Sequence, residues 1–230
     1  MRRLVVPTGC LAIDGLLDGG LEAGTVLLVY GEAETGKTTL ALQLAVSCAS
    51  MGHKALFVDC EGTLRAEKVS ALSGDEPEVL EKLVIARPES FREQGTLIDR
   101  LGLFARAGLR LVVVDTITGL YRRELSEGAK AFALNRELAR QVASLAQVAR
   151  EHGLAAVMTS QVRARLEAAG QAEVEPVAQR ILKFWADLVL RLQLTGQPGL
   201  RIAVLEKSPR PAPRNTAFFR IREEGIVDAV

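Results

Sequence analysis

The chain has 230 residues, of which 48% are hydrophobic and only 4% aromatic, and its formal net charge is +1. This composition predicts one α/β domain over residues 1–230 with a core of Leu, Val, Ala and Ile. The overall charge argues neither for nor against nucleic acid. Three scattered cysteines give no disulfide or zinc framework. With neither a signal peptide nor an apolar run that could span a membrane, we expect a cytoplasmic protein.

Apolar runs alternate with helical patterns along the first 160 residues. Buried strands are predicted at 25–30, 54–60, 82–87, 109–116 and 154–160, and helices at 38–50, 88–108 and 128–152. Because the strands are continuously apolar and separated by helices, they predict a mostly parallel central sheet with helices on both faces. Three later runs, 186–192, 200–207 and 217–221, are separated only by turns. We expect them to be antiparallel strands at one sheet edge.

A glycine-rich loop, GEAETGKTTL over residues 31–40, follows the first of these strands. It fits the Walker A pattern Gly-x-x-x-x-Gly-Lys-Thr, and the strand before it and the helix after it disfavour a chance match. Glycines let backbone N–H groups wrap around phosphates, and the helix start adds a positive dipole end. Lys37 would bridge the β and γ phosphates, and Thr38 would offer its hydroxyl to Mg²⁺. The predicted nucleotide-binding residues are Gly31, Glu32, Ala33, Glu34, Thr35, Gly36, Lys37, Thr38 and Thr39.

Polar side chains end three other predicted strands. Asp115 is expected to hold the metal through water, and its alternative role is to cap a turn. Glu61 is the candidate to orient or deprotonate the attacking water; the alternative is an exposed loop carboxylate. Asp59 fits a turn cap. Gln161 is suited to hydrogen-bond the γ-phosphate and report its loss to the next segment, although a polar residue at a strand end is more often a turn residue.

Four blocks, residues 7–46, 56–69, 111–125 and 155–164, occur in an order and spacing that resembles the core of the RecA/RadA recombinase family. This resemblance implies a RecA-like P-loop ATPase fold that uses ATP and Mg²⁺. Family members place a helix-hairpin-helix domain and a linker before the core, whereas the Thr8-Gly9 motif here lies near the first residue. We therefore expect no such domain. The closing residues, 200–228, make the chain resemble most the archaeal RadB paralogues.

The resemblance also implies roles for further residues. It assigns Asp115 as the Walker B acid, Glu61 to water activation and Gln161 to γ-phosphate sensing, and it adds Arg65 on the nucleotide side. Lys68 stands where the family usually has an arginine beside the adenine. The segment 207–213, KSPRPAP, matches one that caps ATP on the neighbouring protomer, through Lys207, Ser208 and Pro209. The nucleotide would then lie at a subunit interface.

Assembly and DNA binding also follow from the resemblance. Because the linker that joins recombinase cores is missing, we expect a monomer or small homo-oligomer that ATP favours. FARA, 104–107, fits the linker's Phe-x-x-Ala motif but is expected to be core, as is Trp185. In the family, two loops hold single-stranded DNA. The first would offer Arg122 and Arg123 and the second, 162–179, would offer Arg163 and Arg165, with Arg180 beside it. The alternative is that these are ordinary solvated arginines.

Three functions remain open from the sequence. The first is a RadB-like DNA repair and recombination protein that binds ATP-Mg and single- or double-stranded DNA without sequence specificity. It would hydrolyse ATP weakly and act beside the main recombinase. The second is a nucleotide-gated regulator of a partner protein with negligible turnover. The third is a KaiC-like signalling ATPase, but those proteins carry two adjacent glutamates where this chain has Asp59-Cys60-Glu61-Gly62.

Overall fold

A nine-stranded sheet runs through the computed structural model, which describes residues 4–166, 172–210 and 214–229. Its strand order is β13-β12-β11-β10-β3-β7-β6-β4-β5. The parallel strands are β3 (Val26–Gly31), β4 (Lys54–Asp59), β5 (Leu83–Ala86), β6 (Leu109–Asp115), β7 (Ala155–Ser160) and β10 (Leu188–Leu194). The predicted mostly parallel sheet is therefore confirmed, and the carboxyl ends of these strands lie along one edge.

The last four strands differ in part from the sequence prediction. The strands β11 (Leu200–Lys207) and β12 (Thr216–Arg222) are antiparallel and extend one side of the sheet, as expected. A further antiparallel strand, β13 (Gly225–Asp228), which the sequence analysis did not predict, pairs with β12. The prediction was wrong for β10, which is parallel to β3. A short helix, α9 (Gln179–Trp185), precedes β10 and carries the chain back across the sheet. Parallel pairing needs such a crossover, so β10 lies directly beside the P-loop strand.

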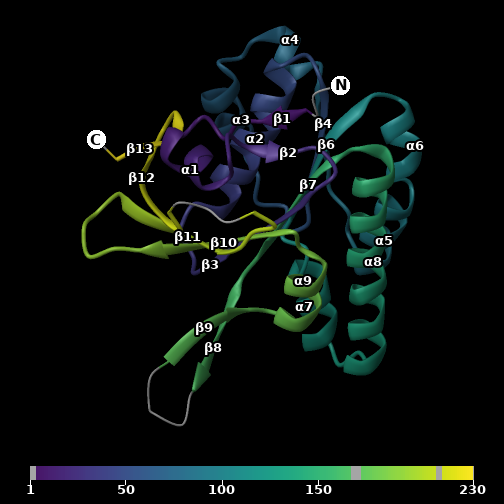
Figure 1. The fold of residues 1–230 in the computed structure, drawn as a ribbon. Helices are drawn as coiled ribbons and strands as arrows, with labels where there is room; N and C mark the ends of the chain where they lie inside the picture. Colours follow the sequence, from purple (N-terminus) through teal and green to yellow (C-terminus); the bar gives the residue numbers. More distant parts are fainter. Residues whose placement is uncertain (1–3, 167–171, 211–213, 230) are drawn as a thin grey trace.

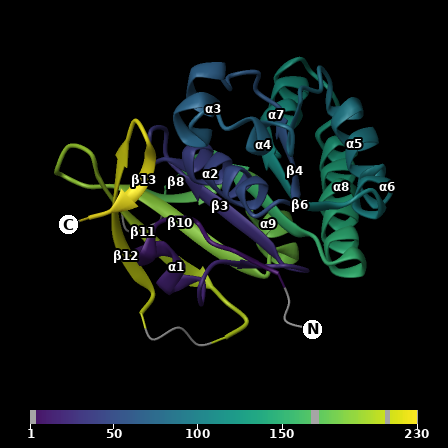
Figure 2. The ribbon, with the colours of Figure 1, turned by 90° about the horizontal axis from the view of Figure 1, so that it is seen from above.

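Helices cover both faces of the sheet (Figures 1 and 2). One face carries α1 (Leu11–Leu16), α2 (Lys37–Ser50), α3 (Ala66–Ser73) and α4 (Pro77–Leu80). The other carries α5 (Phe91–Asp99), α6 (Leu101–Arg106), α7 (Gly119–Ser126), α8 (Ala131–His152) and α9. Successive side chains of β3 enter opposite clusters: Leu27 and Val29 pack with α2, whereas Val26 and Leu28 pack on the α8 side. This two-sided burial explains the continuous apolar strands.

Two small sheets lie outside the main one. In the first, β1 (Val5–Val6) pairs with β2 (Leu21–Glu22). In the second, β8 (Val162–Leu166) and β9 (Ala172–Pro176) form an antiparallel hairpin that projects away from the body of the molecule (Figure 1). This hairpin occupies most of the segment that was expected to be the second DNA-binding loop. None of the helices in the described residues is long and apolar enough to cross a membrane.

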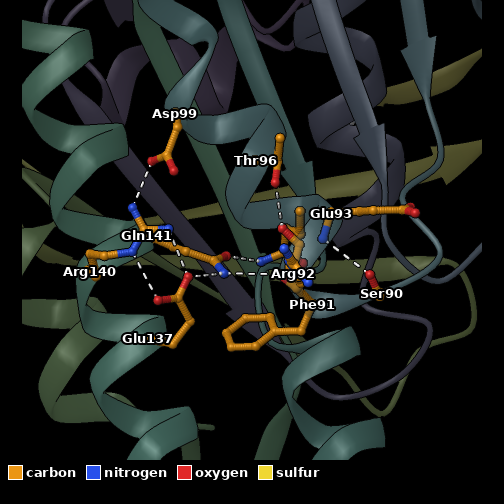
Figure 3. A network of polar contacts seen from close by, with 10 residues as sticks. Ser90, Phe91, Arg92, Glu93, Thr96, Asp99, Glu137, Arg140 and Gln141 are labelled. Atoms are coloured by element: carbon orange, nitrogen blue, oxygen red, sulfur yellow. Dashed lines mark hydrogen bonds and ion pairs between the residues drawn. The ribbon is translucent and has the colours of Figure 1, made fainter.

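The segment predicted as one helix over 88–108 forms two helices, α5 and α6, that meet at Arg100. Polar contacts fix α5 to α8 (Figure 3). Arg140 of α8 pairs with Asp99 at 2.7 Å. The fully buried Gln94 donates from Nε2 to Gln141 Oε1 at 2.9 Å and to the backbone oxygen of Ile117 at 3.1 Å. Ile117 lies just after the end of β6, so this network ties the helices to the carboxyl edge of the sheet.

The two aromatic residues that the sequence predicts to be core differ in their burial. Phe104 is 40% exposed and lines an apolar cavity of about 300 Å³ beside the edge strand β5. In the described part of the chain, β5 is the last strand on this side of the sheet. Trp185 ends α9 instead of starting a strand, and it is half-buried against the core cluster on the α8 side, which agrees with the predicted core role.

Candidate nucleotide-binding site

The P-loop leaves β3 at Gly31 and enters α2 at Lys37. A Cβ atom on Gly31 would lie 2.2 Å from the backbone oxygen of Leu192 in β10, so only glycine fits there. Gly36 has a φ of +99°, and a Cβ on it would lie 2.8 Å from a methyl group of Ile221 in β12. A side chain at either position would clash with a C-terminal strand, and Gly36 also needs a positive φ, so both positions require glycine. The C-terminal strands β10 and β12 thus pack directly against the loop.

Lys37 folds its side chain back into this loop. Its ammonium donates to the backbone oxygens of Gly31 at 2.9 Å and Glu32 at 2.6 Å. Burial lowers the pKa of Lys37, while the carboxylates of Asp115 and Glu61 act in the opposite direction. A buried ammonium held by weak carbonyl acceptors at a helix start fits a phosphate oxygen as a stronger acceptor.

Asp115 ends β6, which is separated from the P-loop strand by β7. Its carboxylate nevertheless interacts with the hydroxyl of Thr38 and accepts a hydrogen bond from the hydroxyl of Thr159. Burial raises the pKa of Asp115 above its ordinary value, and the Thr159 and Thr38 contacts partly offset the shift. A nearby cation would stabilise the ionised form of such a buried carboxylate.

The donor set fits Mg²⁺ in the way that P-loop sites use it. The described residues contain no cluster of three or more His, Cys, Asp or Glu side chains that would hold a metal alone. Magnesium usually takes one or two protein ligands together with substrate phosphates and water. Thr38 and Asp115 provide that small set.

Glu61 and Gln161 meet at the carboxyl ends of β4 and β7. Glu61 Oε1 accepts hydrogen bonds from Gln161 Nε2 at 2.7 Å and from Thr116 Oγ1 at 2.9 Å. The Gln161 side-chain oxygen in turn accepts from Arg122 of α7. Glu61 and Gln161 are 100 positions apart in the sequence, and these hydrogen bonds connect them to each other and to Arg122.

Asp59 has the structural role that the sequence suggested. Its carboxylate accepts from the backbone N–H groups of Thr63 at 3.2 Å and Leu64 at 3.0 Å. Arg87 pairs with the same carboxylate at 3.2 Å. The turn cap is confirmed, and it shapes the segment that presents Glu61.

A polar cavity of about 450 Å³ opens beside the P-loop. Its lining comprises Glu34, Gly36, Lys37, Thr38, Thr39, Lys68, Gly199, Arg201 and Ile221. Sequence reasoning missed the last three, which β11, β12 and the turn before β11 supply. Arg201 Nε donates to the backbone oxygen of Glu34 at 3.1 Å. No motif marks these residues, because the sheet order alone brings them to the loop. Arg65 is exposed and lies outside this lining.

The candidate DNA-contacting arginines lie on α7, α9 and the hairpin (Figure 1). Arg122 and Arg123 belong to α7 and not to a loop, and Arg123 donates to the backbone oxygen of Glu89. Arg180 is exposed in the first turn of α9. On the hairpin, the backbone register places Arg163 opposite Glu175 and Arg165 opposite Glu173. Residues 167–171 of this candidate loop lie outside the described residues.

The segment 207–210 is attached to its own chain. Lys207 donates to the backbone oxygens of Lys183 and Ala186 at the end of α9. Arg210 pairs with Asp18 at 2.8 Å and with Glu22 at 3.1 Å. Ser208 and Pro209 lie between these two attachments, with Pro209 exposed, whereas residues 211–213 are outside the described residues.

The strand order and the P-loop at the carboxyl edge define a protein with a RecA-like α/β fold. Sequence comparison matches residues 1–229 to the Rad51 family. Two relatives, each called "DNA repair and recombination protein RadB", are 36% identical to the chain. The protein from Methanothermobacter thermautotrophicus aligns over 94% of this chain and 93% of its own length. The Thermococcus kodakarensis protein aligns over 97% and 99%.

Structural comparison agrees with these alignments. A solved structure described as "Crystal structure of the RadB recombinase" matches with a TM-score of 0.80 and 32% identity, and it covers 98% of this chain and 100% of that one. The chain therefore belongs to the Rad51 family and, within it, to the RadB proteins. The predicted resemblance and fold class are confirmed. Members of the wider family are in general ATPases that typically use ATP and Mg²⁺.

Proposed function

We propose that this chain is an ATP-dependent DNA repair and recombination protein that binds ATP-Mg and DNA, hydrolyses ATP slowly and acts beside the main recombinase. The names of its RadB relatives support this proposal. The observation that carries it is the meeting of Lys37, Asp115, Glu61 and Gln161 along one edge of the sheet. A cytoplasmic protein with one ATPase core over residues 1–230 is consistent with this function.

Each residue has a defined part in the proposed site. Lys37 would exchange two carbonyl acceptors for phosphate oxygens, while backbone N–H groups from Gly31 to Thr39 would hold the rest of the phosphate chain. Thr38 and Asp115 would hold Mg²⁺, which when bound neutralises charge on the phosphates. Glu61 would orient a water molecule and accept its proton.

Gln161 would link the chemistry to the rest of the molecule. It lies at the end of β7, between the Walker A and Walker B strands, and it contacts both Glu61 and Arg122. A γ-phosphate that drew the Gln161 amide toward itself would release Arg122. The nucleotide state would thereby change the surface of α7 and the hairpin that follows Gln161.

The proposed DNA contacts are electrostatic. Arg122, Arg123 and Arg180, together with Arg163 and Arg165 on the hairpin, would contact backbone phosphates, which carry no sequence information. The segment containing Lys207, Ser208 and Pro209 would close over the nucleotide of a second copy, which favours a small homo-oligomer in the presence of ATP.

Removal of the Lys37 ammonium tests the nucleotide site. We expect Lys37→Ala to abolish or strongly weaken ATP-Mg binding, because a charge-assisted contact in a buried loop is lost. Isothermal titration with ATP and Mg²⁺ measures the affinity, and circular dichroism verifies the fold. Lys82→Ala, at a lysine outside the cavity lining, is the control. Equal ATP affinity in folded Lys37→Ala and native protein would refute the site.

A second function, a nucleotide-gated regulator with negligible turnover, has one observation in its favour. The Glu61 carboxylate is already held by two neutral donors, Thr116 and Gln161, which can serve binding as well as catalysis. ATP turnover with and without single-stranded DNA, measured together with direct DNA binding, separates the two functions. ATP binding without turnover in either condition favours the regulator.

A further inference from the structure

Lys68 reaches the P-loop from a helix outside the Walker A motif. It lies on α3, and its ammonium donates to Thr39 Oγ1 at 2.7 Å. Thr39 is in the first turn of α2, two residues after Lys37, and all three residues line the same cavity. The Lys68 ammonium is therefore held at the start of the phosphate-binding helix.

The electrostatic surroundings place Lys68 on the phosphate side of this cavity. Its pKa is lowered by burial, and the carboxylate of Asp115 acts in the opposite direction. Asp115 is the residue that interacts with Thr38. An ammonium that feels the Asp115 charge and bonds Thr39 lies close to the residues expected to hold Mg²⁺ and phosphate.

The charges along the cavity suit a polyanion. Lys37, Lys68 and Arg201 are three cations among the lining residues, against the single acid Glu34. The start of α2 adds backbone N–H groups and the positive end of the helix dipole. The Lys37 ammonium contacts the loop at Gly31 and Glu32, and the Lys68 ammonium contacts Thr39 in the first turn of α2.

The same lining offers little that could recognise a base, and the segment 207–210 that a second copy would place over it adds no aromatic ring and no amide side chain. Among the described residues that form it there is no aromatic ring and no amide side chain. A lysine ammonium is a compact charge and, unlike a planar guanidinium, does not stack on a ring. Strong discrimination between bases requires buried hydrogen-bonding groups that the wrong base would leave unpaired. The remaining wall consists of Gly199 and the aliphatic Ile221.

We propose that Lys68 is a second phosphate-binding cation of this site, and that the site recognises the triphosphate–Mg chain and not the base. The substrate class is then nucleoside triphosphates in general, purine and pyrimidine alike. The inference rests on the proposed nucleotide-binding function and extends it from ATP to this class. A phosphate oxygen takes the place of the Thr39 hydroxyl as the acceptor for the Lys68 ammonium.

Titration calorimetry of the full chain with Mg²⁺ and, in turn, ATP, GTP, CTP, UTP and inorganic tripolyphosphate tests this inference. We expect the four nucleotides to bind within about threefold of one another, and tripolyphosphate to bind as well. Loss of one charge-assisted hydrogen bond costs at least about 1.4 kcal/mol, which is tenfold. Lys68→Met should therefore weaken all five ligands by about tenfold. Lys68→Arg, which keeps the charge, should retain tripolyphosphate binding, and Lys82→Met is the control for losing a lysine elsewhere.

The other possible outcomes would overturn either the inference about Lys68 and the base or the proposed function. Binding of ATP more than about thirtyfold tighter than the other nucleotides would overturn the inference and leave the proposed function standing. So would a folded Lys68→Met variant that loses affinity for ATP but binds tripolyphosphate as the native chain does, because Lys68 would then contact the base or sugar. Failure of all five ligands to bind the native chain would overturn the proposed function itself.

Discussion

Two regions of the molecule differ in how firmly their charged side chains are fixed. One is the carboxyl edge of the parallel strands, and the other is the surface formed by α7, α9 and the β8–β9 hairpin. At the edge, Lys37 and Asp115 are buried, and each is fixed by contacts with loop carbonyls or hydroxyls. On the other surface, Arg180 is exposed, and Arg123 is fixed by a contact with one backbone oxygen. A preorganised set suits a ligand of fixed geometry, whereas exposed arginines suit a flexible polyanion such as DNA.

Arg122 belongs to both regions, because it lies on α7 and donates to Gln161. The contact between Arg122 and Gln161 therefore couples the two regions. Changes at the fixed edge should have large effects on chemistry and small effects on DNA. Changes on the arginine surface should do the reverse, except at Arg122.

The largest effect is expected at Glu61. Glu61→Gln keeps the size of the side chain and removes its basicity, so ATP should still bind while hydrolysis falls by about 10² to 10⁴ fold. A steady-state phosphate-release assay, with ATP affinity measured on the same sample, follows both quantities. Glu67→Gln, an exposed position on α3, is the matched control. Unchanged hydrolysis in Glu61→Gln would assign the water-activating role to another residue.

A smaller effect separates the two arginines of α7. Each of Arg122→Ala and Arg123→Ala should weaken single-stranded DNA several-fold and reduce the slope of log affinity against log salt by about 0.7, the value for one phosphate contact. Only Arg122→Ala should also lower ATP turnover, because it removes the partner of Gln161. DNA titrations at several salt concentrations, paired with turnover assays, measure both. A salt slope that neither variant changes would contradict DNA contact by α7.

The smallest effect concerns the stability of the nucleotide site. The folded-state pKa of Asp115 is raised by burial, so its ionised carboxylate destabilises the ligand-free fold at neutral pH. Asp115→Asn should therefore raise the melting temperature of the ligand-free protein. In a chain of this size, each ~1 kcal/mol of added stability raises the melting temperature by about 2–4 °C.

The sign of this effect gives a pH test. As the pH falls through the raised pKa, Asp115 becomes protonated in the native protein and the gain from Asn begins to shrink. The gain is lost once the pH is also below the ordinary pKa of an aspartate in the unfolded chain. Thermal melts of the native protein and of Asp115→Asn at neutral and acidic pH measure the difference in melting temperature. Mg²⁺-dependent ATP binding should be lost in the same variant. Glu67→Gln, at an exposed position on α3, is the control. A lower melting temperature of Asp115→Asn at neutral pH would contradict the prediction.

The sequence predicted correctly the positions of those residues whose role depends on the backbone conformation near them in the chain. The Walker A glycines were predictable because a tight loop between a strand and a helix has few sequence solutions. Glu61 and Gln161 were placed at strand ends by hydrophobic runs alone, and the parallel sheet then brought them within 2.7 Å of each other.

The residues that the sequence did not locate depend on the order of strands across the sheet. Arg201 and Ile221 reach the P-loop only because β10 inserts beside β3 and carries β11 and β12 with it. The crossover helix that makes β10 parallel has seven residues, too few to show a clear periodicity. Lys68 was visible as a lysine in a nucleotide-side segment, but its contact with Thr39 depends on how α3 packs on α2.

The close approach of Leu192 to Gly31 means that a growing chain completes the surroundings of its P-loop late. On a ribosome, the Walker A loop is made early, but one side of β3 has no partner until β10 has been synthesised. At typical rates of synthesis, this interval lasts roughly ten seconds or more. During that interval one side of β3 exposes unpaired backbone N–H and C=O groups, which can pair with strands of other chains. Synthesis of β10 removes this exposed edge from the middle of the sheet.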